Sequence, residues 1–343
     1  MSSETPQMNL SSNWTEQEKW VWEKLSKGET ADFTTEEAKG KLNIETKVSQ
    51  ECSEKTVISP VFLRTVLLDE AYRGVLPGFG VRIIGAWVKE PLSLEEVILG
   101  HPWWMDKCLF EAEVLLRCLR TPWLISLESS IFKRTLIIDG GIYEDSLNIK
   151  DSIFNGDLNL NSVEIKKHLL MNGESRFSTV TLDSTKIGGH LVTTNSTFMG
   201  LLTISTLDVG HHLFMNNAQF AEINLGSSQV GGQLEMIGST FKGPLCMSSL
   251  DIKQSLLMNK SQFDEINLGG IKVGGQLEMI GSNFNGPLNM TGSIFEGSLN
   301  ITDSTFRDLL NMNSLEVKQS LIMNKSRFAE VKLGGIKGGG RWR

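Results

Sequence analysis

The chain has 343 residues, of which 40% are hydrophobic, and its formal net charge at pH 7 is -7. From Gly140 onward, 17 Lys and Arg stand against 19 Asp and Glu, so this part of the chain is nearly neutral. Without clustered positive charge we expect no nucleic-acid ligand. No apolar run approaches the roughly 18 residues that a spanning helix needs, so we expect no membrane span.

The N-terminal residues and the cysteines indicate in which cellular compartment the protein is located. The first residues, MSSETPQMNLSSNW, lack the basic and apolar regions of a secretory signal peptide. The cysteines show neither metal-binding spacing nor a dense disulfide framework: Cys52, Cys108, Cys118 and Cys246. We therefore expect reduced thiols and a cytoplasmic location.

Residues 1–78 are predicted to form a small helical cap. The segment 13–29, NWTEQEKWVWEKLSKGE, begins with an Asn or Thr suited to a helix N-cap. The segment 59–73, SPVFLRTVLLDEAYR, has a proline in its first turn and predicts a second helix. The apolar residues of this second segment share roughly one helical face: Phe62, Val66, Leu67 and Ala71.

From residue 79 to residue 337 the chain repeats with a period of about 22 residues. Phenylalanines recur at intervals of 21 to 23 residues: Phe110, Phe132, Phe154, Phe177, Phe198, Phe220, Phe241, Phe263, Phe284, Phe306 and Phe328. A small residue, most often Ser, stands two positions before each Phe. Such a period is typical of a solenoid whose coils stack on one another. We predict a solenoid over 79–337 and a short Gly/Arg tail over 338–343.

Within one period, apolar residues recur in pairs separated by one residue. After Phe263 these pairs are Ile266 and Leu268, Ile271 and Val273, and Leu277 and Met279, followed by Ser282 and Phe284. In extended chain both members of such a pair point to the same side. Four short inward-facing segments per coil follow. The residues Gly269, Gly270, Gly274 and Gly275 mark corners, where we expect glycine to supply unusual backbone angles.

This pattern resembles the pentapeptide-repeat family, and the resemblance covers about residues 81–337. It implies a mainly β protein, a right-handed parallel and quadrilateral β-helix, and the phenylalanine spacing gives it 21–23 residues per turn. The most similar segments are DSIFNG at 151–156, GSTFKG at 238–243, GSNFNG at 281–286 and DSTFRD at 303–308. Many steps have six residues rather than five, and three faces carry Leu where the family has a small residue. A three-sided right-handed β-helix is the alternative, and four pairs per turn without an inserted loop favour four sides.

Seven of the eight tryptophans fall before residue 124: Trp14, Trp20, Trp22, Trp87, Trp103, Trp104 and Trp123. They could line a partner site or fill the joint between the helices and the first coils. We favour the joint, because the end of a solenoid must be covered.

Three histidines, His168, His190 and His212, occupy the same register in consecutive coils. Imidazoles stacked at the strand separation could bind zinc or share protons. The alternative is a polar corner position, since later coils place Gln or Ser there. A straight ladder does not converge on one ion, so we predict no metal and no cofactor.

Beside these histidines, Leu170, Val192 and Phe214 are predicted to point outward from adjacent strands. Adjacent exposed apolar residues favour a partner surface, with incidental exposure as the alternative. We therefore predict an interaction patch formed by these three residues and the three histidines.

No phosphate-binding loop, dinucleotide fingerprint, nucleophile elbow or H-E-x-x-H motif occurs in the sequence. The nearly constant turn length also leaves no loop to build a cleft. We therefore expect a non-catalytic scaffold that docks other proteins, rather than an enzyme. The resemblance also implies an alternative, a rod that mimics DNA and binds a type II topoisomerase, which the nearly neutral charge disfavours.

Near the C-terminus the repeat is incomplete, because Gly338 of GGIKGGG aligns with the inward residue Val273. An uncovered β edge pairs readily with another chain. The sequence thus predicts a dimer edge at Val331, Leu333 and Ile336, and a twofold homodimer through the C-terminal coil.

Overall fold

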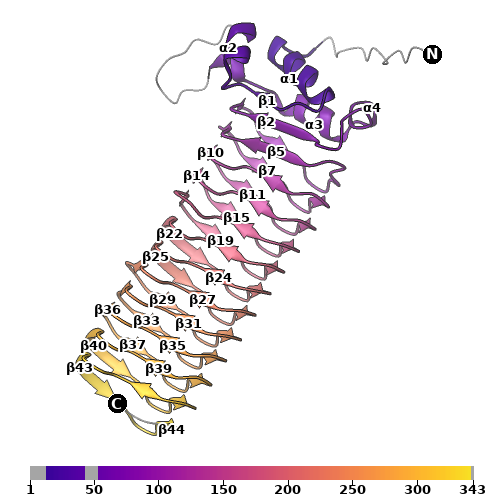
Figure 1. Ribbon diagram of the computed structural model, residues 1–343. Coiled ribbons are helices and arrows are strands. Elements are labelled where there is room, and N and C mark those ends of the chain that lie inside the picture. The colour runs from indigo at the N-terminus through magenta and orange to yellow at the C-terminus, as the bar shows by residue number, and fades with distance from the viewer. Residues whose placement is uncertain (1–12, 43–52, 341–343) are drawn as a thin grey trace.

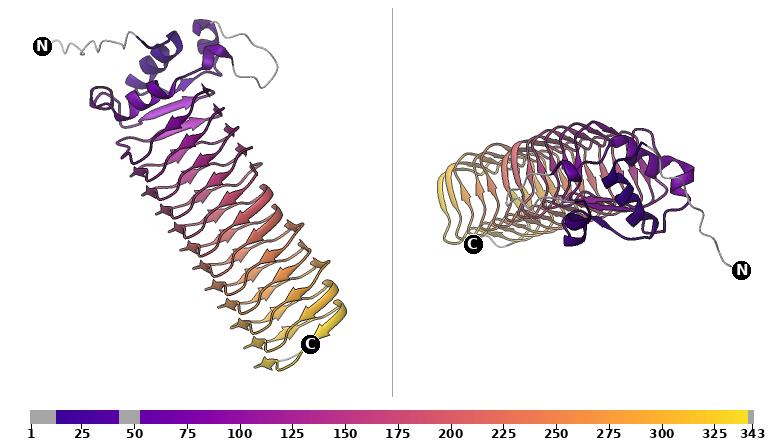
Figure 2. Two further views of the ribbon diagram at one scale, coloured as in Figure 1. Left: turned by 180° about the vertical axis from the view of Figure 1, so that it is seen from behind. Right: turned by 90° about the horizontal axis from the view of Figure 1, so that it is seen from above.

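The computed structural model describes residues 13–42 and 53–340. It is a long parallel β-solenoid, with the helices gathered at its N-terminal end (Figure 1). Figure 2 shows the coils stacked along one axis, with the helices over one end of the stack. The prediction of a mainly β solenoid with a small N-terminal helical region is confirmed.

Apart from the first and last described coils, each coil contributes strands to four ladders, so the solenoid has four sides. Sheet A is one side, and its strands in spatial order are β1 (Ala31–Asp32), β2 (Val81–Ile84), β5 (Trp103–Asp106), β9 (Ile125–Ser126), β13 (Leu147–Asn148), β17 (Leu169–Leu170), β21 (Leu191–Val192), β24 (Leu213–Phe214), β27 (Leu234–Glu235), β31 (Leu256–Leu257), β35 (Leu277–Glu278), β39 (Leu299–Asn300) and β42 (Leu321–Ile322). Sheet C is another side: β8 (Arg120–Thr121), β12 (Ile142–Tyr143), β16 (Glu164–Ile165), β20 (Lys186–Ile187), β23 (Asp208–Val209), β26 (Gln229–Val230), β30 (Asp251–Ile252), β34 (Lys272–Val273), β38 (Ile294–Phe295), β41 (Glu316–Val317) and β44 (Lys337–Gly338).

Sheet B holds the other two sides. Its first ladder carries the phenylalanines: β3 (Trp87–Val88), β6 (Leu109–Phe110), β10 (Ile131–Phe132), β14 (Ile153–Phe154), β18 (Arg176–Phe177), β28 (Thr240–Phe241), β32 (Gln262–Phe263) and β36 (Asn283–Phe284). Its second ladder comprises β4 (Leu92–Ser93), β7 (Val114–Leu115), β11 (Leu136–Ile137), β15 (Leu158–Asn159), β19 (Val180–Thr181), β29 (Leu245–Cys246), β33 (Ile266–Asn267) and β37 (Leu288–Asn289). Four longer strands run through the corner and join both ladders: β22 (Thr197–Thr203), β25 (Gln219–Asn224), β40 (Thr305–Asn311) and β43 (Arg327–Lys332).

The phenylalanines form a continuous stack inside the solenoid. Adjacent rings from Phe110 to Phe328 lie nearly parallel, with centroids 4.5 to 5.2 Å apart. The ladder is buried as predicted as far as Phe306, whereas Phe328 in the last coil is only half-buried. The inward pairs, such as Leu277 and Met279, are buried beside it.

A ladder of buried hydroxyls explains the small residue that precedes each Phe. The Ser261 Oγ accepts a hydrogen bond from the Ser239 N–H (3.2 Å) and donates to the Met236 carbonyl (2.6 Å). One coil further, the Ser282 Oγ accepts from the Ser261 N–H (3.1 Å). Buried backbone groups need such partners because water does not reach them, so a serine here satisfies a donor and an acceptor at once.

The corners use glycine for two different reasons. Gly270 has a φ of 67°, in the left-handed region, as expected. For Gly269, Gly274 and Gly275 that expectation is wrong, since none of them has a positive φ. There the coils approach closely: a Cβ on Gly274 would lie 2.3 Å from the Lys253 carbonyl oxygen, and one on Gly275 2.5 Å from the Ser255 Oγ.

The N-terminal helices are α1 (Glu16–Ser26), α2 (Glu36–Leu42), the 3₁₀ turn η1 (Glu54–Thr56), α3 (Pro60–Leu68) and α4 (Glu70–Arg73). Thr15 caps α1 in a capping box, in which its Oγ accepts from the Glu18 N–H and Glu18 accepts from the Thr15 N–H. The predicted helix over 59–73 is interrupted, because Asp69 is extended and caps α4. The outward position of Ala71 follows from this break. No helix among the described residues is long and apolar enough to span a membrane.

The region before residue 79 also contributes backbone to the solenoid. Strand β1 pairs in parallel with β2, with Ala31 opposite Ile83, and so extends sheet A by one strand. The Ile58 N–H donates to the Trp87 carbonyl (3.0 Å), and this hydrogen bond satisfies part of the edge of β3, the first strand of sheet B. The cap therefore satisfies edges that would otherwise pair with other chains.

The tryptophans mostly fill this cap and its joint. The Trp14 ring packs on Phe62, with centroids 4.9 Å apart, and Trp20 packs on Phe33 at 5.1 Å. Trp103 is buried in the first coils. Three tryptophans are exceptions to the interpretation that we favoured: 41% of Trp123 is exposed, and Trp87 and Trp104 are half-buried on the outer side of their strands.

We expect Phe220→Ala to lower the free energy of unfolding by about 3 to 5 kcal/mol, the usual range for truncating a buried aromatic residue. Phe328→Ala should cost less, because that ring is half-buried and has a stacked Phe on one side only. Urea denaturation followed by circular dichroism measures both. Equal and small losses would show that the stack contributes little to stability.

The backbone conformation at Lys260 predicts a stabilising substitution. Its φ is 56°, and Gly281 holds the equivalent corner one coil later with a φ of 67°. Because left-handed conformation costs a non-Gly residue about 1–2 kcal/mol, partly offset by the greater freedom of unfolded Gly, we expect Lys260→Gly to stabilise by roughly 0.5–1 kcal/mol. The reverse change, Gly281→Lys, should destabilise by a similar amount without a clash, since the nearest atom to its Cβ is 3.8 Å away. Thermal melts of both variants provide the measurement.

Candidate functional site

The three predicted histidines form a ladder on sheet A. His168, His190 and His212 each precede the first residue of β17, β21 and β24. The rings of His168 and His190 are stacked with centroids 5.0 Å apart, and those of His190 and His212 are 5.1 Å apart. The interplanar angles are 6° and 8°, so the rings lie nearly parallel. We call these three residues the histidine ladder.

Each ring of the histidine ladder accepts a hydrogen bond from the backbone of the next coil. The His168 Nδ1 accepts from the His190 N–H (3.0 Å), and the His190 Nδ1 accepts from the His212 N–H (3.2 Å). The His212 Nδ1 accepts from the Gln233 N–H (2.9 Å). An accepting nitrogen carries no proton, so in this arrangement the ring proton lies on Nε2.

The same position accepts a backbone N–H in other coils through serine. The Ser146 Oγ accepts from the His168 N–H, the Ser255 Oγ from the Gln276 N–H and the Ser298 Oγ from the Ser320 N–H. This arrangement matches the polar corner that we considered as the alternative to a metal site. Parallel rings with Nδ1 already engaged do not converge on one ion. Among the described residues, no group of three or more His, Cys, Asp or Glu has the geometry to hold a metal.

Glycines make room for two of these hydrogen bonds. A Cβ on Gly189 would lie 2.6 Å from the His168 Nδ1, and one on Gly232 would lie 2.5 Å from the His212 Nδ1. The equivalent residue in the middle coil is His211, whose ring centroid is 5.4 Å from that of His190. Sequence reasoning missed His211, although the His-His dipeptide at 211–212 was a visible signal.

The surroundings disfavour a charge on the central imidazole. Burial lowers the pKa of His190, and the neighbouring rings of His168, His212 and His211 lower it further. In the described part of the chain, no carboxylate forms an ion pair with the histidine ladder to oppose this effect. The central ring of the ladder is therefore held toward its neutral form.

The apolar residues beside the histidine ladder point outward, as the alternation predicts. Leu170 lies opposite Val192 in the parallel register, and Val192 lies opposite Phe214. All three are half-buried, while the adjacent Leu169, Leu191 and Leu213 are fully buried. We call Leu170, Val192 and Phe214 the apolar stripe.

The apolar stripe has polar borders and is fixed by its neighbours. The Phe214 ring packs against the His212 ring, with centroids 5.4 Å apart. Toward the N-terminus Asn148 lies opposite Leu170, and toward the C-terminus Glu235 lies opposite Phe214. The stripe is thus limited to three coils, and its role as an interaction patch stays a prediction.

The predicted dimer residues lie in the last described coil. Val331 and Ile336 are half-buried, and 45% of Leu333 is exposed. Their counterparts one coil earlier, Leu310 and Met312, are fully buried. Gly338 lies opposite the buried Val317, so this coil lacks an inward side chain there, as the alignment indicated.

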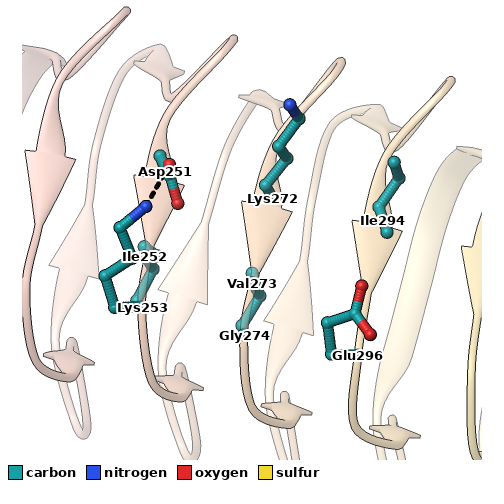
Figure 3. A pocket seen from close by; sticks show the side chains of 8 residues that line it. All are labelled: Asp251, Ile252, Lys253, Lys272, Val273, Gly274, Ile294 and Glu296. Carbon is teal, nitrogen blue, oxygen red and sulfur yellow. Dashed lines mark hydrogen bonds and ion pairs between the residues drawn. The ribbon is translucent and has the colours of Figure 1, made fainter.

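Sheet C carries a shallow, open groove of about 390 Å³ where Gly274 lacks a side chain between β30, β34 and β38. Figure 3 shows Lys253 paired with Asp251 within this groove, while Lys272 and Glu296 lie apart on neighbouring strands. The Lys253 to Asp251 distance is 2.6 Å. Lys253 and Asp251 are therefore paired with each other, and the charges of Lys272 and Glu296 lie apart and do not converge on one point.

Comparison with known proteins gave no match to a family model, to a curated protein or to a solved structure. The parallel solenoid with a spacing of about 22 residues is shown by the structure itself. The resemblance to the pentapeptide-repeat family rests on the sequence pattern.

The histidine ladder predicts a loss of stability in mild acid. The folded state holds the pKa of His190 below its ordinary value of 6.5, so the unfolded chain binds more protons as the pH falls below 6.5. Stability should therefore decrease as the pH is lowered from 7.5 to 5, and urea titrations across this range measure it.

The matched control replaces all three residues of the histidine ladder by Ser. The Ser255 hydroxyl already accepts a backbone N–H at this position, so the variant keeps an acceptor but loses the titrating group. We expect a smaller loss of stability between pH 7.5 and 5 in this variant. An unchanged pH dependence would contradict the assignment.

Proposed function

We propose that this chain is a non-catalytic scaffold of the pentapeptide-repeat type, which docks other proteins on the flat faces of its solenoid. The observation that carries the proposal is the apolar stripe, where three hydrogen-bonded strands present adjacent apolar side chains outward. Contiguous apolar surface on a soluble domain is characteristic of an interaction site. The stacked imidazoles beside the stripe extend this surface with further flat rings.

Rigidity is a further argument for docking. The stripe lies on strands that pair on both sides within sheet A, and the histidine ladder fastens each coil to the next. A surface that is already ordered loses little conformational entropy when a partner binds. We place this scaffold in the cytoplasm, an assignment supported by Cys118 and Cys246, which are free thiols within residues 13–42 and 53–340.

Substitution of the apolar stripe tests the proposal. We expect Leu170→Ser, Val192→Ser and Phe214→Ser together to abolish partner binding and to change the melting temperature little, because these side chains are half-buried. Partners captured from the source cell by the wild-type chain should be purified and titrated against both proteins. Leu257→Ser, at the equivalent outward position of β31, is the matched control and should bind as the wild type does. Retained binding by the triple variant would refute the docking role of the stripe.

The DNA-mimicking alternative is less well supported. Mimicry needs unpaired negative charge along the rod, whereas carboxylates here pair with lysines of adjacent coils, as in Lys133–Glu111 (3.0 Å) and Lys167–Asp145 (2.7 Å). Others pair within a strand, as in Lys318–Glu316 (2.6 Å). We expect no inhibition of gyrase supercoiling by the purified chain, and inhibition at stoichiometric amounts would favour mimicry.

The proposal also includes homodimerisation through Val331, Leu333 and Ile336. These residues carry the apolar surface left uncovered in the last described coil, and β43 pairs on one edge only within the described chain. A second copy could add its own β43 to that edge. Light scattering should show a dimer that becomes monomeric when Val331 and Leu333 are changed to Lys. A wild-type chain that stays monomeric at high micromolar concentration would exclude this element of the proposal.

A further inference from the structure

Arg82, on the outer side of β2, lies between two aromatic rings near the N-terminal end of sheet A. Its Cζ is 4.1 Å from the ring centroid of Trp104 and 5.0 Å from that of Phe79. Trp104 lies directly opposite Arg82 in the parallel pairing of β2 with β5. The guanidinium is therefore held by one ring from its own coil and one from the next. We call Phe79, Arg82 and Trp104 the arginine clamp.

The backbone fixes the position of the outer ring of the clamp. Gly80 has a φ of 69°, and its N–H donates to the Pro77 carbonyl (2.9 Å) in a tight turn. A Cβ on Gly80 would lie 2.2 Å from the Pro102 carbonyl oxygen, so only glycine fits there. This turn places Phe79 at the corner of the coil, where 58% of its surface is exposed.

The guanidinium has no acidic partner within residues 13–42 and 53–340, and its Nε is buried without a hydrogen bond. The carboxylate on β5, Asp106, accepts instead from the Ser126 Oγ (2.6 Å) and from the Glu128 N–H (2.9 Å). With the Nε covered by protein, the two terminal amino groups of Arg82 are the donors that a ligand can reach. Such a planar pair of donors matches the two oxygens of a carboxylate.

The corner beside the clamp adds aromatic surface. Phe79, His101 and Trp123 follow one another one coil apart, as the register of β2, β5 and β9 requires. Trp123 is 41% exposed, and its Nε1 donates to the Gly100 carbonyl (3.1 Å). An anion bound at Arg82 would therefore have apolar ring surface next to it.

We propose that the arginine clamp binds the carboxylate of an Asp or Glu side chain in an acidic segment of a partner protein, whose apolar neighbours lie on Phe79 and Trp123. One guanidinium offers one pair of parallel donors, which suits a singly charged carboxylate, whereas phosphorylated motifs are recognised by clusters of arginines. This inference rests on the docking function proposed above, but it uses a different part of sheet A. The residue equivalent to Arg82 in the apolar stripe, Leu170, lies four coils away.

The probe is the capped peptide acetyl-Leu-Glu-Glu-Phe-amide, titrated into the full chain and followed by NMR of the arginine Nε–H and tryptophan indole signals. Its matched control is acetyl-Leu-Gln-Gln-Phe-amide, which has the same shape without charge. We expect the acidic peptide to bind with a Kd at least about tenfold lower than that of the amide peptide, as charged hydrogen bonds contribute.

Two substitutions separate the clamp from general electrostatics. Arg82→Gln should raise the Kd of the acidic peptide at least about tenfold, and Arg82→Lys should also weaken binding, because the ammonium keeps the charge but not the fork. Arg134→Gln removes the same charge from an exposed arginine without a ring contact, and should leave the Kd unchanged. A melting temperature close to that of the wild type shows that each variant is folded.

Four results would overturn the inference. The first is that the acidic peptide does not bind up to millimolar concentration, and the second is that the two peptides bind with equal affinity. The third is that Arg82→Gln and Arg134→Gln weaken binding of the acidic peptide equally. The fourth is that inorganic phosphate binds more tightly than the acidic peptide. The triple Ser variant of the apolar stripe distinguishes this inference from the docking proposal. This variant should bind the acidic peptide as tightly as the wild type does. A loss of binding would show that the peptide binds at the apolar stripe instead of the clamp.

Discussion

The hydrogen bonds between successive coils are the constraint on which the rest of this structure depends. The short strands of one coil lie on different sides and do not pair with one another. Their N–H and C=O groups must therefore form hydrogen bonds with the coils on either side. This pairing holds every residue opposite its equivalent 21 to 23 positions away, as Phe132 lies opposite Phe110 and Phe154. Length differences are consequently absorbed at corners, as where β22 and β25 shift register after Phe198.

This constraint explains why so much of the fold was predictable. A position that recurs in every coil selects the same type of residue each time. The inward pairs and the phenylalanine ladder could therefore be recognised from the sequence alone. Features that occur only once in the chain could not be recognised in this way. Asp69 interrupts a helix whose apolar pattern continues to Ala71, since a single capping carboxylate prevailed over the pattern. Likewise β1 has only two residues, too few to show alternation.

The candidate site was predictable in position but not in chemistry. The sequence placed His168, His190 and His212 in one register, whereas the role of Nδ1 as an acceptor depends on ring rotation about the side chain. The clamp was missed for a related reason. Arg82 and Trp104 are 22 positions apart and share a register, but the stacking of a guanidinium on a ring requires a side-chain conformation that spacing alone does not determine.

The pairing of β1 with β2 has a consequence for the order of folding. Ala31 and Ile83 are about 52 positions apart, while neighbouring coils meet across about 22, and the entropy lost on closing a chain segment rises with its length. In addition, β1 requires the finished edge of sheet A as its template. The segment that carries β1 is therefore among the last to dock. Until then its tryptophans and the unpaired edge of the first coil are exposed, where chaperones or incorrect partners can bind them.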